Sequence, residues 1–147
     1  MAAGSGVTNP PHIEELPNYQ TAIAARYLLM AGLTSRGFVC APTIDNAPHV
    51  DLLAVSGDMR RALALSVKGT SRRVTPSFFW PIKTSKKVLR FPRSRVFWYA
   101  FVDVQREEVF LVPSVSARIR RSPIRKGGNR WYWVDHCDVV DYRNNWP

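Results

Sequence analysis

Asp51 and Lys68 are the residues of this 147-residue sequence whose types and spacing could do chemistry together. They lie at the outer ends of two apolar runs, residues 51–56 and 62–68, with a short polar turn between them. Two such runs around a turn predict a β-hairpin. A carboxylate can hold a hard metal ion, and an ammonium group can stabilise negative charge. The same two groups on a strand surface can equally form a plain ion pair.

The hairpin pattern also predicts which residues lie opposite one another. If the turn is a four-residue loop, Leu53 pairs with Ala64 and Asp51 lies opposite Ser66. Lys68 is then on the same face as Ser66 and one diagonal away from Asp51, because side chains alternate along a strand. The other residues of the second strand on this face are alanines. The face is therefore small and polar, and it leaves room for a ligand.

One helix and several further strands are expected around the hairpin. Apolar residues at helical spacing and several alanines predict a helix at 19–35 that approaches a sheet closely, with Asn18 as its N-cap. The run at 95–104 is almost continuously apolar, which indicates a central strand buried on both faces. The other strands are expected at residues 38–43, 50–56, 62–70 and 109–115, and a short aromatic strand is expected within the tail at 118–142. This order predicts a mixed α/β domain with one sheet and a helix packed against it.

Length and composition indicate one folded domain. Residues 1–17 are rich in Gly, Pro and small residues and are expected to form a flexible leader, which leaves a single domain at 18–147. The sequence has no secretory signal and no apolar run long enough to span a membrane, which predicts a soluble protein without membrane contact. Cys40 and Cys137 form no CxxC pair, so zinc is not expected and a reducing cytoplasm fits best.

The charge of the chain favours a polyanionic partner. Lys and Arg total 21 against 11 Asp and Glu, which gives a formal net charge of +10, and the pI is near 10.3. Nucleic acid is the first partner to expect from such a balance. A surface that is basic only for solubility is the alternative.

The excess of positive charge is concentrated in residues 60–95, which contain many Lys and Arg and no Asp or Glu. Aromatic residues interleave with the cations, which is typical of surfaces that follow a phosphate backbone and stack on bases. The same rings could instead pack into the core, with the cations solvated around them. The candidate nucleic-acid-binding cations are Arg72, Arg73, Lys83, Lys86 and Lys87, and the aromatic residues are Phe78, Phe79, Trp80 and Phe91.

Motifs for other chemistries are weak. No strand is followed by the Gly-rich loops of nucleotide-binding folds, and no Ser/His/Asp or Cys/His arrangement can be recognised. The stretch "DHCD" at 135–138 contains residue types that bind metals. Adjacent residues on a strand point to opposite faces, however, and cannot all converge on one ion. No metal site is therefore expected there.

The hairpin and its surroundings resemble a known superfamily. "VDLLAV", followed by a turn and "LALSVK", resembles the core of the PD-(D/E)xK nucleases, in which a strand aspartate precedes a strand that ends in acid-x-lysine. The similarity extends back over "ARYLLMAGLTSRGFVCAPTIDNAPHVDLLAV" and forward to "FWYAFVDVQREEVFLVPS", and so covers about residues 18–115. It implies the restriction-endonuclease-like fold of a small bacterial member with a degenerate motif. That fold is α/β, with a central mixed sheet and an N-terminal helix packed on it.

The resemblance implies a role for each matching residue. Asp51 becomes the metal carboxylate, the Val67 carbonyl a backbone ligand and Lys68 the catalytic cation, with Mg²⁺ or Mn²⁺ as the cofactor. Ser66 stands where the family has an acid or an amide, so it would reach a metal only weakly, through water. Arg26 stands where many relatives carry a glutamate. It could repel the metal and substitute for it by pairing with Asp51, or it could face solvent.

Three functions remain open at this point. The leading one is a nucleic-acid-binding protein of nuclease fold that, if active, is a Mg²⁺-dependent endonuclease acting on DNA or RNA through a weakened metal site. A catalytically silent nucleic-acid-binding protein is equally compatible with Ser66 and Arg26. The third is an inactive scaffold that uses the segment Pro76–Phe91 to bind an acidic protein partner. The resemblance also allows a homodimer, because many nucleases of this fold dimerise.

Overall fold

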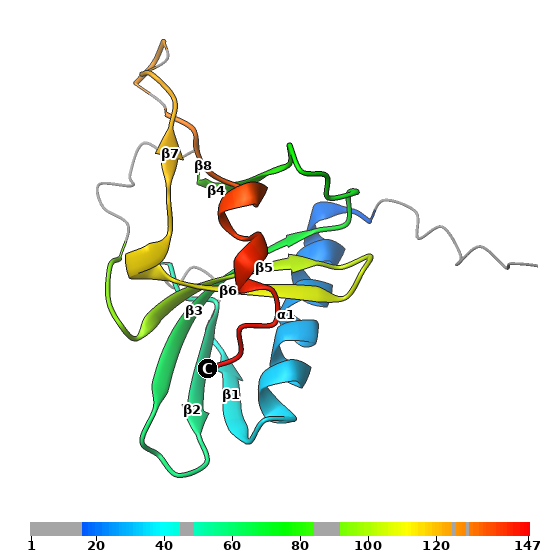
Figure 1. The fold of residues 1–147 in the computed structure, drawn as a ribbon, viewed down its shortest axis with the longest axis vertical. Helices are drawn as coiled ribbons and strands as arrows, with labels where there is room; N and C mark the ends of the chain where they lie inside the picture. Colours follow the sequence, from blue (N-terminus) through cyan, green and yellow to red (C-terminus); the bar gives the residue numbers. More distant parts are fainter. Residues whose placement is uncertain (1–15, 45–48, 84–91, 125, 129) are drawn as a thin grey trace, which may run out of the picture.

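One helix and a mixed sheet form the main body of the computed structural model (Figure 1). The structure describes residues 16–44, 49–83, 92–124, 126–128 and 130–147. Most of the expected leader lies outside these residues, as do Lys86, Lys87 and Phe91. Within the described part of the chain, no helix is both long enough and apolar enough to cross a membrane.

Helix α1 (Asn18–Thr34) packs one face against the sheet. Its buried residues recur at every fourth position, as Thr21, Ala25, Leu29 and Leu33. This spacing keeps side chains on one side of a helix. The N-cap prediction is wrong: Asn18 is already helical, and Pro17 occupies the cap position without a side-chain hydrogen bond. The ring of Pro17 restricts φ, so this residue forms the turn into the helix.

The main sheet has five strands in the order β1 (Phe38–Pro42), β2 (Leu52–Ser56), β3 (Ala62–Thr70), β5 (Phe97–Asp103) and β6 (Glu108–Pro113). Neighbouring strands are antiparallel except β3 and β5, which are parallel. A parallel pair needs a long crossover connection, which residues 71–96 provide. The α/β class with a central mixed sheet and an N-terminal helix packed on it is therefore confirmed.

The β2–β3 hairpin has the register that the sequence predicts. Leu53 pairs with Ala64, and the Ser56 N–H donates to the Arg61 carbonyl at 2.8 Å. Asp58 fixes the turn between them, because its carboxylate accepts a hydrogen bond from Ser56 Oγ at 2.6 Å. A shift of one residue would have moved every side chain of β3 to the other face of the sheet.

Helix α1 lies very close to β3 at Gly69. A Cβ atom at this position would lie 2.5 Å from Ala25 Cβ and 3.1 Å from the Thr21 carbonyl oxygen, so the contact requires glycine. Thr21 also donates its hydroxyl to Ser71 Oγ at 3.1 Å. The start of α1 is thereby fixed beside the end of β3.

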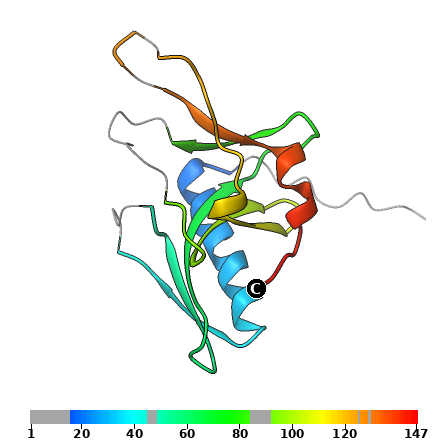
Figure 2. The ribbon, with the colours of Figure 1, turned by 60° about the vertical axis from the view of Figure 1, so that its left-hand side comes forward.

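A second sheet covers the face of the main sheet opposite α1 (Figure 2). Its three strands have the order β4 (Phe79–Lys83), β8 (Tyr132–Asp135) and β7 (Arg120–Arg121). Short 3-10 helices occur at Ser114–Ser116 (η1), His136–Asp138 (η2) and Val140–Tyr142 (η3). The sequence predicts only one sheet, and the structure corrects this. The aromatic face of β5 and β6 needs a cover, and β4 and β8 provide it.

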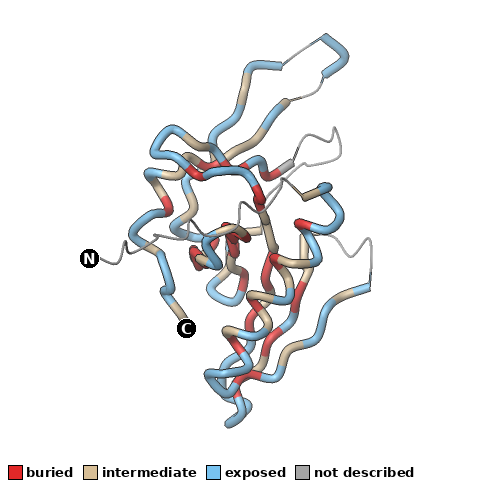
Figure 3. The backbone as a smooth tube through the Cα atoms, turned by 90° about the vertical axis from the view of Figure 1, so that its right-hand side faces the viewer, coloured by how far each residue is buried: buried red, intermediate tan, exposed pale blue. Residues whose placement is uncertain are grey.

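Buried residues occur both on α1 and along the strands (Figure 3), and they form separate cores on the two faces of the main sheet. The core beneath α1 is mostly aliphatic and includes Leu52 and Leu65. The core beneath the second sheet, called here the aromatic core, includes Trp80, Tyr99 and Phe110. Strand β5 is buried along almost its whole length and contributes to both cores, which confirms its prediction as a central strand.

Candidate functional site

The structure brings Asp51, Ser66 and Lys68 to a single small cavity, called here the Asp51 cavity. Its volume is about 230 Å³, and its lining residues are His49, Asp51, Ser66, Lys68, Ile82, Phe97 and Tyr99. Asp51, Ser66 and Lys68 therefore share a face of the sheet, as the register requires. This face is the one opposite α1, since its apolar neighbours Ile82 and Phe97 belong to the aromatic core.

Backbone hydrogen bonds on both sides hold Asp51 just before β2 begins. Its N–H donates to the Leu65 carbonyl at 2.8 Å, and its carbonyl accepts from the Thr43 N–H at 3.1 Å. The carboxylate Oδ2 accepts from the Val67 N–H at 2.7 Å and from Ser66 Oγ at 3.4 Å. The pairing of β2 with β3 ends at Leu52 and Leu65. Beyond that pair, the Asp51 carboxylate accepts the hydrogen bond from β3 that a carbonyl of a neighbouring strand would otherwise accept.

Asp51 and Lys68 share the cavity without pairing with each other. Both residues are described, and no ion pair joins them within that described set. Asp51 is held by donors from β3 instead. The Asp51 carboxylate is therefore held in place by β3.

Arg26 lies half-buried on α1, and its Nε atom is buried without a hydrogen-bond partner. No ion pair between Arg26 and Asp51 occurs among the residues that the structure describes. Helix α1 packs on the face of β3 that carries Leu65, whereas Ser66 and Lys68 line the cavity on the opposite face. The structure gives no support for Arg26 as a substitute for the metal charge.

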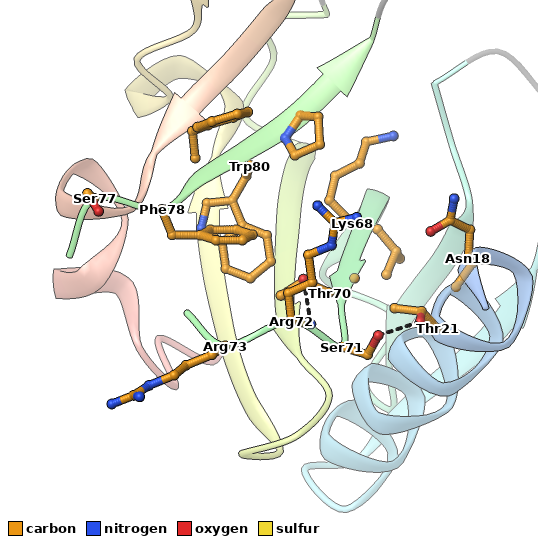
Figure 4. Close-up of a pocket in the computed structure, with 15 residues that line it drawn as sticks. Asn18, Thr21, Lys68, Thr70, Ser71, Arg72, Arg73, Ser77, Phe78 and Trp80 are labelled. Atoms are coloured by element: carbon orange, nitrogen blue, oxygen red, sulfur yellow. Dashed lines mark hydrogen bonds between the residues drawn. The ribbon is translucent and has the colours of Figure 1, made fainter. Parts of the chain in front are cut away.

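A larger groove, whose lining residues are drawn in Figure 4, shares Lys68 with the Asp51 cavity. This groove, called here the basic groove, has a volume of about 710 Å³ and lies between the start of α1, the end of β3 and the start of β4. Arg72 and Arg73 both line it. In Figure 4, Arg72 runs alongside Lys68 toward the groove, whereas the guanidinium group of Arg73 points away. The two neighbouring arginines are therefore not equivalent.

The sequence left open whether the aromatic residues beside the groove stack on bases or pack into the core, and the structure shows that they differ in exposure. Trp80 is 1% exposed and belongs to the aromatic core. Phe78 is half-buried and packs edge-on against Trp80, with ring centroids 5.0 Å apart. Phe79 is 51% exposed, and its ring could stack on a base. Lys83 ends β4, but its side chain is not part of the described structure.

Tyr99 belongs to the cavity, and sequence reasoning missed it. It lies opposite Ser66 in the parallel pairing of β3 and β5. The residue is 2% exposed, and its hydroxyl is buried without a hydrogen-bond partner. Burial raises the pKa of Tyr99 to about 12. The one signal in the sequence was a hydroxyl group in the middle of the buried run "FWYAFV".

A separate group of metal-ligating residue types lies at the end of β8. Asp135, Cys137 and Asp138 are called here the acidic turn. Their candidate ligand atoms lie within 4.8 Å of one another. The expectation that they cannot converge is wrong, because the strand ends at Asp135 and a 3-10 helix follows. Arg120 pairs with both carboxylates, and Arg118 lies 3.7 Å from Asp138. These arginines already neutralise the acidic turn.

The Asp51 cavity offers a divalent metal an incomplete set of ligands. Mg²⁺ is held by hard oxygen ligands, usually one or two carboxylates with waters and substrate phosphates. Asp51 is the one carboxylate lining this cavity within the described structure, and its Oδ2 already accepts two hydrogen bonds. Val67 turns its N–H toward Asp51, and its carbonyl lies on the same side of the strand. Ser66 adds only a neutral hydroxyl, and the Lys68 ammonium would repel a cation. These residues do not form a metal site by themselves.

Comparison with known proteins gives one informative result. No family model matches the sequence, and no curated protein matches it significantly. The fold is similar to the solved structure of a bacterial homing endonuclease, I-Ssp6803I, with a TM-score of 0.57 and 13% sequence identity over 88% of each chain. At this identity the likeness concerns the fold alone. The fold is therefore nuclease-like, while membership of the PD-(D/E)xK superfamily is not established.

Proposed function

We propose that this chain binds nucleic acid, with a backbone phosphate in the Asp51 cavity and the adjoining strand in the basic groove. The observation that carries the proposal is the position of Lys68, which lines both spaces on a nuclease-like fold. An ammonium group at the junction can contact a phosphate in the cavity while the next phosphate lies beside Arg72. The homing endonuclease with the similar fold acts on nucleic acid by its name, which supports this choice of partner.

Electrostatics support the same partner. The net charge of +10 attracts a polyanion over a distance and raises the rate of encounter. Each phosphate that a cation of the groove neutralises releases counterions from the nucleic acid, so the affinity should fall as salt is added. Phe79 offers an exposed ring at the groove, on which any base can stack. Contacts of these kinds do not read a sequence, so we propose binding with little sequence preference.

The matched test of the groove uses its two neighbouring arginines. Binding of a short fluorescein-labelled DNA duplex and of the same sequence as RNA is measured by fluorescence anisotropy over a series of salt concentrations. Arg72→Ala should weaken binding severalfold and lower the salt slope by about one. Arg73→Ala removes the same charge from a side chain that points away, so it should have a smaller effect. Equal effects of both variants, or salt-insensitive binding by the native chain, would contradict the proposal.

Metal-dependent cleavage of DNA or RNA is the second candidate function, and the joint presence of Asp51 and Lys68 in one cavity favours it. Because the chain supplies one carboxylate there, we propose that Mg²⁺ or Mn²⁺ binds weakly and only together with phosphate oxygens. Labelled DNA and RNA incubated with Mn²⁺ should show slow cleavage that is lost in both Asp51→Asn and Lys68→Ala. Cleavage that persists in both variants would remove this second candidate, and tight Mn²⁺ binding to the protein alone would contradict the weak site.

A further inference from the structure

We infer that the Tyr99 hydroxyl is a built-in hydrogen-bond donor for a phosphate group in the Asp51 cavity. The inference deepens the proposed function and rests on it, because the phosphate is taken to be that of a nucleic-acid backbone. It adds a residue that neither the motif resemblance nor the charge pattern of the sequence singles out.

The buried hydroxyl of Tyr99 is an exception that calls for an explanation. Buried polar groups almost always have a hydrogen-bond partner, because water has been removed from them at a cost. Tyr99 Oη and Arg26 Nε are the two buried side-chain atoms of the described structure that have none. A phenylalanine would fill the same space in the aromatic core without that cost. A bound ligand that accepts a hydrogen bond would account for the tyrosine.

The surroundings of Tyr99 hold its ring in a fixed orientation. Phe97 meets the ring edge-on with centroids 5.3 Å apart, and Phe101 stacks on it at 6.0 Å. On the neighbouring strand Ser66 lies directly opposite in the parallel register. Both Ser66 and Tyr99 line the cavity. The hydroxyl is therefore positioned before any ligand arrives, which lowers the entropic cost of binding.

The chemistry of the cavity points to an anion as the ligand. Lys68 brings an ammonium group, and Tyr99 brings a protonated hydroxyl, whose pKa burial raises from 10 to about 12. The Asp51 carboxylate, which lines the same cavity, already receives hydrogen bonds from Ser66 and Val67 on its Oδ2 atom. Lys68 thus adds a positive charge to the cavity and Tyr99 an unpartnered donor, and an ionised phosphate, which only accepts hydrogen bonds, matches both.

The size of the cavity points to a single phosphate group. Its volume of about 230 Å³ lies below the range of about 300–1,000 Å³ that is usual for whole small-molecule ligands. A phosphate group with a few waters fits such a space, whereas the sugar and base of a nucleotide would have to lie outside it. The basic groove next to Lys68 is the place where they could lie.

The test compares Tyr99→Phe with Tyr142→Phe in the full chain. Tyr142 is a partly buried tyrosine packed against the same aromatic core, but it does not line the cavity. Tyr99→Phe should unfold at the same temperature as the native chain or higher, since it removes a hydroxyl without a partner. The same variant should bind a short labelled DNA duplex about tenfold more weakly. Inorganic phosphate should raise the unfolding temperature of the native chain and of Tyr142→Phe, but not that of Tyr99→Phe.

Each outcome of this test decides something. If the native chain and Tyr99→Phe bind DNA equally and respond equally to inorganic phosphate, the inference about Tyr99 is overturned while the proposed function stands. If no nucleic acid binds but phosphate stabilises only chains with the Tyr99 hydroxyl, the phosphate site stands and the proposed function fails. If the native chain responds to neither probe, both are wrong. A loss of stability in Tyr99→Phe without ligand would also contradict the inference, because it would show a hidden structural partner for the hydroxyl.

Discussion

The Asp51 cavity and the acidic turn both gather side chains that could bind an ion, yet they differ in what already satisfies those side chains. In the acidic turn, Arg120 pairs with both carboxylates, and Arg118 lies near one of them. In the cavity one carboxylate is held by donors from β3, while the Tyr99 hydroxyl has no partner. The first arrangement is electrostatically complete, and the second still has a donor to offer.

This difference shows how a ligand site can be separated from an ion-pair network. By residue type alone, the acidic turn has more potential metal ligands than the cavity. Its carboxylates are already charge-compensated, however, and a cation would have to displace the arginines. A cavity with an unsatisfied buried donor gains a hydrogen bond when an anion enters. The number of ligand-type residues is therefore a weaker guide to binding than the number of polar groups left without partners.

The largest difference between the two regions should appear in nucleic-acid affinity. Lys68→Ala should weaken binding of a labelled DNA duplex by about tenfold to a hundredfold, because it removes a charged donor from the phosphate contact. Arg120→Ala removes one positive charge as well, but from a side chain paired with Asp135 and Asp138. It should change the affinity less than about threefold. Similar losses in both variants, measured by anisotropy at one salt concentration, would mean that only the total charge matters.

The next effect concerns the stability of the unliganded protein. Asp51→Ala leaves the Val67 N–H without its acceptor and should lower the free energy of unfolding by about 1–3 kcal/mol. Asp51→Asn keeps an oxygen in the same place and should lose much less. Urea unfolding of the two variants beside the native chain measures both values. If Asp51→Ala were as stable as the native chain, the carboxylate would have no structural role and the argument about its hydrogen bonds would fail.

A smaller, pH-dependent effect should arise beside the acidic turn, at His136. Burial is the main reason why the pKa of His136 lies below its ordinary value of 6.5. Trp80 Nε1–H donates to His136 Nδ1 at 3.4 Å, which requires that nitrogen to be unprotonated. The unfolded chain therefore takes up the proton at a higher pH than the folded chain does. Stability is complete above about pH 6.5 and falls as the pH drops through the lower pKa of the folded state.

Thermal unfolding of the native chain and of His136→Phe between neutral and mildly acidic pH checks this expectation. The variant keeps an aromatic ring against Phe110 but cannot titrate. Its unfolding temperature should vary less with pH over that window than that of the native chain. An identical pH dependence in both proteins would place the titrating group elsewhere.

The hairpin could be predicted from the sequence because its register depends on local information. A turn of four residues and the alternation of side chains are enough to place Leu53 opposite Ala64, and so to put Ser66 and Lys68 on one face. The central position of β5 was also readable, because a strand buried on both faces needs a continuous apolar run. These features depend on residues close together in the chain.

The remaining features depend on residues that are far apart in the sequence. The second sheet joins β4 to β8 across about fifty residues, and its strands are short and show no clear period. Tyr99 enters the cavity only because β3 and β5 pair in parallel, with Ser66 opposite it. The acidic turn converges because β8 ends at Asp135, and strand boundaries are poorly defined by sequence. Such long-range pairings and element ends could not be predicted from local patterns.

Amide chemical shifts of the isotope-labelled chain, followed by NMR while a short DNA duplex is added, test the central claim most directly. We predict that the largest changes occur at Ser66, Val67 and Lys68, where a phosphate would lie beside the carboxylate and the ammonium group. The amides of Cys137 and Asp138 should change little, because the acidic turn is already neutralised. Changes confined to the acidic turn, or bound DNA that leaves the amides of the Asp51 cavity unmoved, would contradict the account.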